Sequence, residues 1–236
     1  MTKREWTLIQ REPASAAANM AFDAMLLKRL SCVQQPVLHL YEWESPSVTY
    51  GYFIDPEKYL SCASLDSYGL QLARRPTGGG VIFHQCDLTF SVLMPANHSA
   101  YTTNTLENYA WINRIVSGAI SRFLRQAVSV SLLEESSLSN RPFCMVDPTV
   151  FDVMIEGKKV AGGAQRRTKA GYLHQGSIAL GIPDPALLKA VLRDSAIGET
   201  MIAKTYPLTC EKTSPEQIVQ SKQELMLLLI DNFKNT

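Results

Sequence analysis

The spacing of apolar residues along the chain predicts its helices and strands. Apolar residues recur at helical spacing in four stretches, which predicts helices over residues 15–30, 106–127, 185–192 and 215–233. Runs rich in β-branched and aromatic residues predict strands over residues 8–10, 37–43, 47–52, 70–75, 81–84, 88–94, 150–155, 157–160 and 177–180. A turn that contains Pro46 separates the second and third of these strands, and we expect those two to pair antiparallel. Mixed strands and helices without a repeat or linker predict one α+β domain over residues 1–236.

Composition narrows the class of protein. With 46% hydrophobic residues among 236, the chain is long enough for one large core. A net charge of +1 gives no surplus of Lys and Arg for a nucleic-acid backbone. The five cysteines are scattered without a Cys-x-x-Cys pair, which argues against a disulfide framework and a zinc site. Because no signal core and no run of about twenty apolar residues is present, we expect a soluble cytoplasmic protein with neither nucleic-acid nor membrane partners.

A first glycine-rich segment places cations beside a flexible loop. Arg74 and Arg75 end a predicted strand, Gly78, Gly79 and Gly80 follow, and His84 closes the next strand. Glycines without a Cβ let backbone N–H groups approach an anionic ligand closely. The segment lacks the Gly-Lys-Ser/Thr ending of a phosphate-binding loop and the spaced glycines of a dinucleotide fold. Since neighbouring strand residues alternate faces, we expect only one of the two arginines to point into a site.

A second segment places lysines before another run of small residues. Glu156 and Gly157 predict a tight hairpin turn, and the strand after it begins with Lys158 and Lys159. Strand alternation sends the two lysines to opposite faces, so one of them can act as a point charge on a carboxylate or phosphate. Two solvated lysines on an ordinary hairpin are the alternative interpretation.

The two segments together resemble the catalytic domain of lipoate-protein ligases and octanoyltransferases and, more distantly, of biotin-protein ligases. Residues 74–84 resemble the family pattern Arg-Arg-x-Thr/Ser-Gly-Gly-Gly-x-x-x-His, and residues 157–165 resemble Gly-x-Lys-Ile/Val-x-Gly-Ser/Gly-Ala-Gln. The resemblance covers residues 5–185 and implies a class II synthetase-like fold, with a mixed, largely antiparallel sheet flanked by helices. It implies that substrate is bound by Arg74, Arg75, Thr77, Gly78, Gly79, Gly80, His84, Asp152, Gly162, Gly163, Ala164, Gln165 and His174.

The resemblance also implies a reaction. Family members attach a lipoyl or octanoyl chain to a lysine of the lipoyl domains of 2-oxoacid dehydrogenase E2 subunits or of the glycine-cleavage H protein. In the ligases, ATP with Mg²⁺ activates lipoate as an acyl-adenylate, and the role of the matching lysine falls on Lys159. An acyl chain needs an apolar channel beside a small cationic centre. Lys159 can supply the cationic centre. We therefore expect Lys159→Ala to fold but not to acylate a lipoyl domain.

A second branch of the family moves octanoate from acyl carrier protein through a cysteine thioester and needs no cofactor. Its pattern Cys-x-x-x-Pro-x-x-x-Glu/Asp matches the stretch from Cys144 to Asp152, which makes Cys144 a candidate nucleophile, with a buried inert thiol as the alternative. Residues 88–91 also resemble this branch, whereas Gly80 follows the ligase form. Because the family includes short ligases built from the catalytic domain alone, the resemblance favours the ligase. A module that binds a lipoyl domain without catalysis is a third hypothesis. The chain is shorter than a two-domain ligase, so we expect no C-terminal accessory domain, and no carboxylate cluster indicates a metal site.

Overall fold

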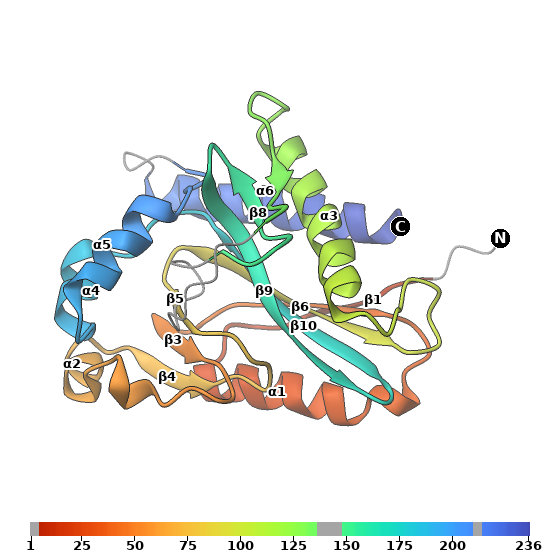
Figure 1. Cartoon of the computed structure of the whole chain (residues 1–236), viewed down its shortest axis with the longest axis horizontal. Coiled ribbons are helices and arrows are strands. Elements are labelled where there is room, and N and C mark those ends of the chain that lie inside the picture. The colour runs from red at the N-terminus through yellow and green to blue at the C-terminus, as the bar shows by residue number, and fades with distance from the viewer. Residues whose placement is uncertain (1–4, 136–147, 210–213) are drawn as a thin grey trace.

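Two β-sheets form the framework of the structure, a computed structural model in which residues 5–135, 148–209 and 214–236 are described (Figure 1). The larger sheet has the strand order β1-β2-β6-β10-β9-β8-β7, and the smaller one has the order β4-β3-β5. The larger sheet consists of β1 (Thr7–Gln10), β2 (Val37–Tyr41), β6 (Asp87–Pro95), β10 (Gly171–Ala179), β9 (Lys158–Thr168), β8 (Val153–Ile155) and β7 (Ser131–Leu132). The smaller sheet consists of β4 (Gln71–Arg74), β3 (Ser47–Tyr50) and β5 (Val81–His84). The β1–β2 and β3–β4 pairs are parallel and the other described pairs are antiparallel, so the predicted mixed, largely antiparallel α+β fold is confirmed.

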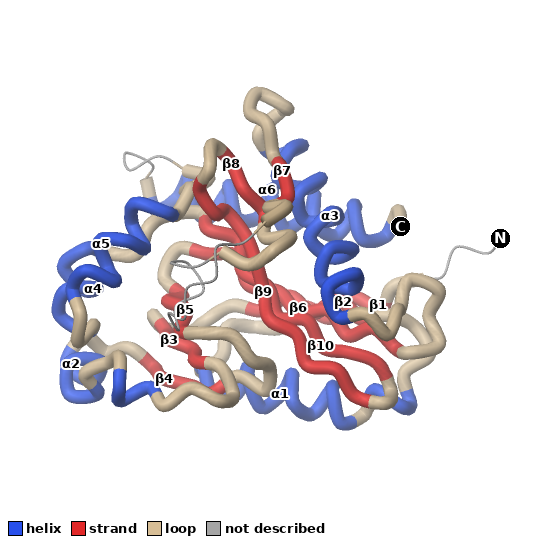
Figure 2. The backbone as a smooth tube through the Cα atoms, in the orientation of Figure 1, coloured by secondary structure: helices blue, strands red, loops and turns tan. Residues whose placement is uncertain are grey.

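Helices cover both sheets (Figure 2). The α-helices are α1 (Ala16–Lys28), α2 (Cys62–Ser67), α3 (Thr105–Phe123), α4 (Pro185–Val191), α5 (Ser195–Lys204) and α6 (Pro215–Lys234), and short 3-10 helices span Leu30–Cys32 and Pro56–Lys58. The Asn104 side chain caps the start of α3, and Ser214 with Gln217 forms a capping box at the start of α6. Helices α3 and α6 pack on the larger sheet, whereas α4 and α5 pack on the smaller one.

Alternation from Leu88 to Val92 of β6 gives this part of the larger sheet one apolar and one polar face. Leu88, Phe90 and Val92 pack beneath α3 and α6 in the main core. Thr89 and Ser91 point to the opposite face, where they hydrogen bond to buried carboxylates. The polar face of the larger sheet therefore lies away from α3 and α6, and it carries much of the candidate site.

The predicted antiparallel pairing of residues 37–43 with residues 47–52 is wrong. Strand β2 pairs with β1 and β6 in the larger sheet, whereas β3 pairs with β4 and β5 in the smaller sheet. All five side chains of β2 are buried. A strand buried on both faces needs partners and layers on either side, and a local hairpin supplies only one partner strand.

Other differences concern length and missed elements. Helices α2 and α5 were not predicted, and α1 and α3 end a few residues before the predicted limits. Strands β9 and β10 are longer than predicted, so Gly162 and Gly163 lie inside β9 rather than beyond a strand end. The tight turn at Glu156 and Gly157 is confirmed, because both residues have positive φ angles, of 50° and 73°.

Candidate functional site

The loop of residues 76–80 joins β4 to β5 and is held from inside by one arginine. Arg75 is 3% exposed, and its guanidinium donates to the carbonyl oxygens of Gly78 at 3.1 Å and Gly80 at 2.6 Å. Arg74 is exposed and lies over the Tyr52 ring, 4.9 Å from its centroid. The prediction that the two arginines take opposite faces is confirmed. Arg75 holds the shape of the loop, which we call the glycine loop.

A second buried chain of hydrogen bonds fixes the glycine loop to the larger sheet. The Thr77 hydroxyl donates to Gln175 Oε1 at 2.7 Å, and Gln175 Nε2 donates to Asp23 Oδ2 at 2.7 Å. The other oxygen of Asp23 accepts from Ser91 at 2.8 Å and lies 2.9 Å from His39 Nδ1. Thr77 was predicted, whereas Asp23 and Gln175 were missed. An aspartate in the middle of the alanine-rich α1, the one acidic residue of that helix, was the sequence signal for this chain.

Lys159 forms a buried ion pair with Asp152. Its ammonium donates to Asp152 Oδ2 at 2.7 Å, and the two side chains are 4% and 0% exposed. Asp152 also accepts from the Thr149 N–H at 2.6 Å and from the Tyr109 hydroxyl at 2.5 Å. Burying a charge pair costs solvation, which these additional hydrogen bonds offset. Lys158 is exposed, so the predicted alternation of the two lysines is confirmed.

Tyr109, on α3, was not predicted and connects this ion pair to β9. Its hydroxyl accepts a hydrogen bond from the Gly163 N–H at 2.8 Å and donates to Asp152. Burial and then the negative charge of Asp152 raise the pKa of Tyr109 well above its ordinary value. The hydroxyl therefore keeps its proton and acts as a fixed donor to the carboxylate.

The two glycines in β9 make room for the protein's own side chains. A Cβ on Gly162 would lie 2.4 Å from Asp152 Oδ1 and 2.6 Å from Lys159 Cε. A Cβ on Gly163 would lie 2.5 Å from His174 Nε2. By contrast, a Cβ on Gly78 would meet open space. Gly78 therefore leaves open space in which a ligand could approach the backbone of the glycine loop. Gly162 and Gly163 instead leave space that the side chains of Lys159, Asp152 and His174 fill.

His174 is neutral in the folded protein. Burial lowers the pKa of its imidazole to about 3. Its Nδ1 lies 3.1 Å from the side-chain amide of Gln165, while Nε2 has no hydrogen-bond partner among the described residues. The ring stacks against Phe90. The predicted residues His174, Gln165 and Gly163 therefore lie together, next to Ala164 on β9.

The two glycine-rich segments meet along one wall of the molecule. Arg166, which follows Gln165 on β9, donates to the Pro76 carbonyl of the glycine loop at 3.1 Å. A cavity of about 190 Å³ between them is lined by Tyr52, Phe53, Pro76, Gly78, Gln165 and Arg166. A neighbouring cavity of about 480 Å³ is lined by Ala17, Met20, Ala21, Ala24, Tyr50, Tyr52, Leu72, Ala73, Arg74, Arg75, Pro76 and Arg166. The glycine loop and β9 therefore border a common open region.

Some predicted features lie outside the described residues or have no counterpart within them. Cys144 and the three residues after it are outside the described ranges, whereas Asp152 at the end of that pattern is the buried partner of Lys159. In the described ranges, no three His, Cys, Asp or Glu side chains are placed to hold a metal ion. Within the same ranges, every helix is too short or too polar to cross a membrane.

Comparison with known proteins agrees with this geometry. Residues 15–206 match the family model described as the lipoyl protein ligase A/B catalytic domain. The octanoyltransferase LipM of Anoxybacillus flavithermus is 35% identical over 195 residues, which cover 79% of this chain and 69% of the relative. The bi-partite lipoate protein ligase of Thermoplasma acidophilum, solved in a study that includes its E2 lipoyl domain, superposes with a TM-score of 0.65 at 21% identity, over 97% of this chain and 84% of its own.

A crystal structure of lipoate-protein ligase A bound with ATP has a TM-score of 0.66 at 21% identity, over 98% of this chain and 96% of its own. These structural similarities confirm the predicted lipoate ligase-like fold. The matched residues include the glycine loop, Asp152, Lys159 and His174. Among them, Lys159 pairs with Asp152, and β9 contacts the glycine loop through Arg166. The chain is therefore an enzyme of the lipoyl protein ligase A/B catalytic domain family.

Proposed function

We propose that this enzyme transfers an octanoyl chain from acyl carrier protein to the lysine of a lipoyl domain, with Cys144 as the nucleophile. The observation that carries the proposal is the Cys-x-x-x-Pro-x-x-x-Asp pattern, which begins at Cys144 and ends at the buried partner of Lys159. The sequence alone favoured the ligase. The name of the relative that is 35% identical supports the transferase instead.

The chemistry requires two acyl transfers. The Cys144 thiolate attacks the carbonyl carbon of the octanoyl thioester, and the carrier thiol leaves with a proton. The amine of the acceptor lysine then attacks the new thioester, an amide bond forms and the cysteine thiol is regenerated. Each step places negative charge on the carbonyl oxygen, which a positioned ammonium stabilises. We assign this role to Lys159, which Asp152 holds in place.

The larger cavity suits the acyl chain. Its volume of about 480 Å³ is in the range of small-ligand pockets, and Ala17, Met20, Ala21 and Leu72 supply apolar lining. Arg75 lines the same cavity while holding the glycine loop. Pro76 and Arg166 line both this cavity and the smaller one at Gly78, so an aliphatic chain in the larger cavity would extend toward the glycine loop.

The ATP-dependent ligase is the second candidate, and Gly80 favours it. A third glycine at this position follows the ligase pattern. In that reaction ATP with Mg²⁺ activates lipoate, and Lys159 contacts the carboxylate and the α-phosphate of the acyl-adenylate. Both candidates end with acylation of a lipoyl domain, or of the glycine-cleavage H protein, and they differ in the donor and in the need for Cys144.

Mass spectrometry of an acceptor domain separates the candidates. The purified enzyme is incubated with an apo lipoyl domain and either octanoyl acyl carrier protein without ATP or lipoate with Mg-ATP. We expect octanoylation in the first mixture and its loss in Cys144→Ser. Cys86→Ser is the matched control, because Cys86 is a free, partly buried thiol outside the Cys144 pattern.

Two outcomes would contradict the transferase. ATP-dependent lipoylation that survives Cys144→Ser would establish the ligase instead. Thermal stabilisation by lipoate or by the lipoyl domain, without any covalent product in either mixture, would indicate a binding module that does not catalyse.

A further inference from the structure

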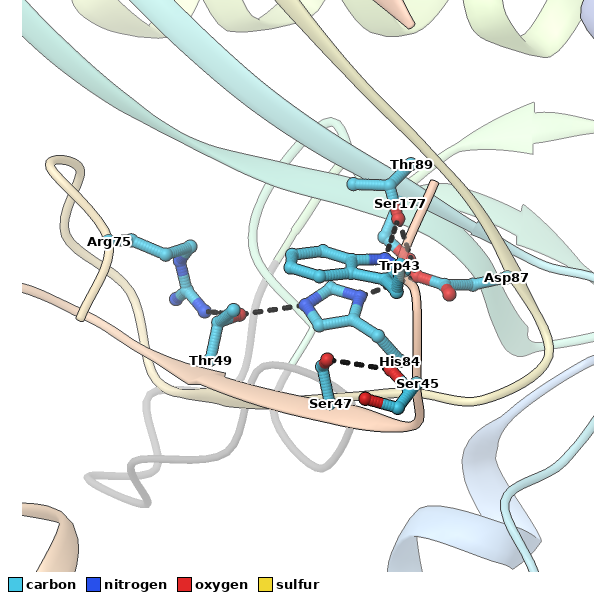
Figure 3. Close-up of polar contacts among 9 residues, drawn as sticks. All are labelled: Trp43, Ser45, Ser47, Thr49, Arg75, His84, Asp87, Thr89 and Ser177. Carbon is cyan, nitrogen blue, oxygen red and sulfur yellow. Dashed lines mark hydrogen bonds and ion pairs between the residues drawn. The ribbon is translucent and has the colours of Figure 1, made fainter. Parts of the chain in front are cut away.

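A buried hydrogen-bond chain connects the glycine loop to a His–Asp pair (Figure 3). Arg75 Nη1 donates to Thr49 Oγ1 at 2.8 Å, and Thr49 Oγ1 lies 2.7 Å from His84 Nε2. His84 Nδ1 lies 2.7 Å from Asp87 Oδ2. Thr49 is 0% exposed, and Arg75, His84 and Asp87 are at most 9% exposed. The chain therefore runs from the loop through the interior and is largely shielded from bulk water.

The far end of this chain is rigidly held. Asp87 Oδ2 also accepts from Ser177 at 2.7 Å and from Thr89 at 3.1 Å. The Trp43 indole N–H donates to the same Thr89 hydroxyl at 2.9 Å, and the indole ring stacks on His84 with 4.2 Å between ring centroids. The imidazole is thus fixed both in its plane and at each nitrogen.

The two ends of the chain have fixed donors and acceptors. Asp87 is ionised: burial acts to raise its pKa, but the charge of His84 and hydrogen bonds from His84 and Ser177 together bring it below the ordinary value. An ionised carboxylate only accepts, so His84 Nδ1 donates to it. A guanidinium only donates, so Thr49 Oγ1 accepts from Arg75 while the same oxygen is held by its hydrogen bond with His84 Nε2. The His–Asp pair therefore fixes the position of the Thr49 oxygen that faces the guanidinium.

The guanidinium in turn fixes the direction of a backbone N–H. Arg75 holds the Gly78 carbonyl oxygen on the inner side of the loop. In a planar trans peptide the carbonyl and the following N–H point in opposite directions. The N–H of Gly79 therefore points away from Arg75, and Gly79 is exposed with a φ of 81°. The loop thereby presents a donor on its outer side.

We propose that Thr49, His84 and Asp87 are positioning residues for acyl transfer, because through Arg75 they set the orientation of the Gly79 N–H toward the acyl carbonyl. This inference rests on the proposed function, since acyl transfer is its activity readout. None of the three residues is required to touch the substrate.

Replacing Thr49 tests the inference. Thr49→Val removes both hydrogen bonds at constant shape, and we expect kcat for acyl transfer to fall about 100-fold, the loss that a misplacement of about 1 Å can cause. Thr49→Ser keeps the hydroxyl and should restore most of the rate. Ser47→Ala is the matched control: Ser47 is buried on the same strand, but its hydroxyl donates to the Ser45 carbonyl and belongs to no part of the chain. Its kcat should equal that of the wild type.

Two further measurements distinguish positioning from a general loss of structure. His84→Asn retains a donor toward Asp87 but has no group to reach Thr49, so Thr49→Val combined with His84→Asn should be no slower than the slower single variant. In protein labelled with ¹⁵N-glycine, the Gly78, Gly79 and Gly80 amide resonances should shift in Thr49→Val and not in Ser47→Ala. This second readout requires no activity, so it remains decisive if the enzyme proves to be an ATP-dependent ligase or inactive as a transferase.

The opposite results would overturn the inference. A wild-type kcat in Thr49→Val, unmoved loop resonances or rate losses that add in the double variant would each show that the chain only stabilises the fold. If Thr49→Val does not fold, His84→Asn takes its place. A wild-type rate with unmoved loop resonances in a folded His84→Asn would then assign the chain a purely structural role.

Discussion

The buried pair of Lys159 and Asp152 changes the expected outcome of replacing the lysine. The sequence suggested a variant that folds normally but does not acylate. In the structure, Lys159 is 3% and Asp152 is 0% exposed, so Lys159→Met leaves a carboxylate charge in the interior. Among the described residues, Thr149 and Tyr109 then remain to hydrogen bond it. Removing one partner of a buried ion pair costs about 3–5 kcal/mol. We therefore expect Lys159→Met to lose stability as well as activity.

Urea unfolding, followed by circular dichroism, measures this loss. With an m-value of about 3 kcal/mol per M, the midpoint should fall by about 1–1.7 M. Adding Asp152→Asn to Lys159→Met removes the unpaired carboxylate charge. The double variant should therefore recover most of the lost urea midpoint without recovering acyl transfer. Lys158→Met, on the exposed face of the same strand, is the control and should leave both quantities unchanged. An Lys159→Met midpoint equal to that of the wild type, or no recovery in the double variant, would refute the reasoning.

Three further predictions concern single residues. The folded-state pKa of His174, about 3, lies below the unfolded value of about 6.5, so the unfolded state binds more protons between these pH values. The unfolding free energy should thus fall by up to about 1.4 kcal/mol per pH unit as the pH drops from 6.5 toward 3. Urea unfolding of His174→Phe at a series of pH values should show a smaller fall over the same range. Gly162→Ala should abolish acyl transfer, because its Cβ would displace Asp152 from Lys159, and an acylation assay with a thermal melt checks this; a normal rate would contradict the assigned role of the pair. A Cβ on Gly157 would meet no neighbouring atom, but the residue has a positive φ that alanine adopts at a cost. Gly157→Ala should therefore lower the unfolding free energy by about 1 kcal/mol and leave the transfer rate unchanged.

Features that depend on neighbouring residues could be predicted from the sequence. Alternation along a strand placed Arg74 and Arg75, and likewise Lys158 and Lys159, on opposite faces. The positive φ of Gly157 followed from the tight turn that precedes the lysines. These properties are set by backbone geometry within a few residues, so no knowledge of the remaining chain is needed.

Features that depend on which segments meet could not be predicted. Tyr109 shows as one apolar position on a helix, yet its hydroxyl reaches Asp152 across 43 residues of sequence. Thr49 contacts Arg75 and His84 because β3 pairs with β4 and β5 instead of with β2. With the strands paired as the sequence suggested, this hydrogen-bond chain would not exist.

The sequence by itself determined most of the longer elements, the two glycine-rich segments and the side of each strand on which their cations lie. Tertiary structure decided what those cations contact: Arg75 holds the carbonyls of the glycine loop, and Lys159 is neutralised by Asp152. The physical reason is that a buried charge needs partners to offset its lost solvation. Those partners come from segments distant in sequence, so only the folded chain identifies them.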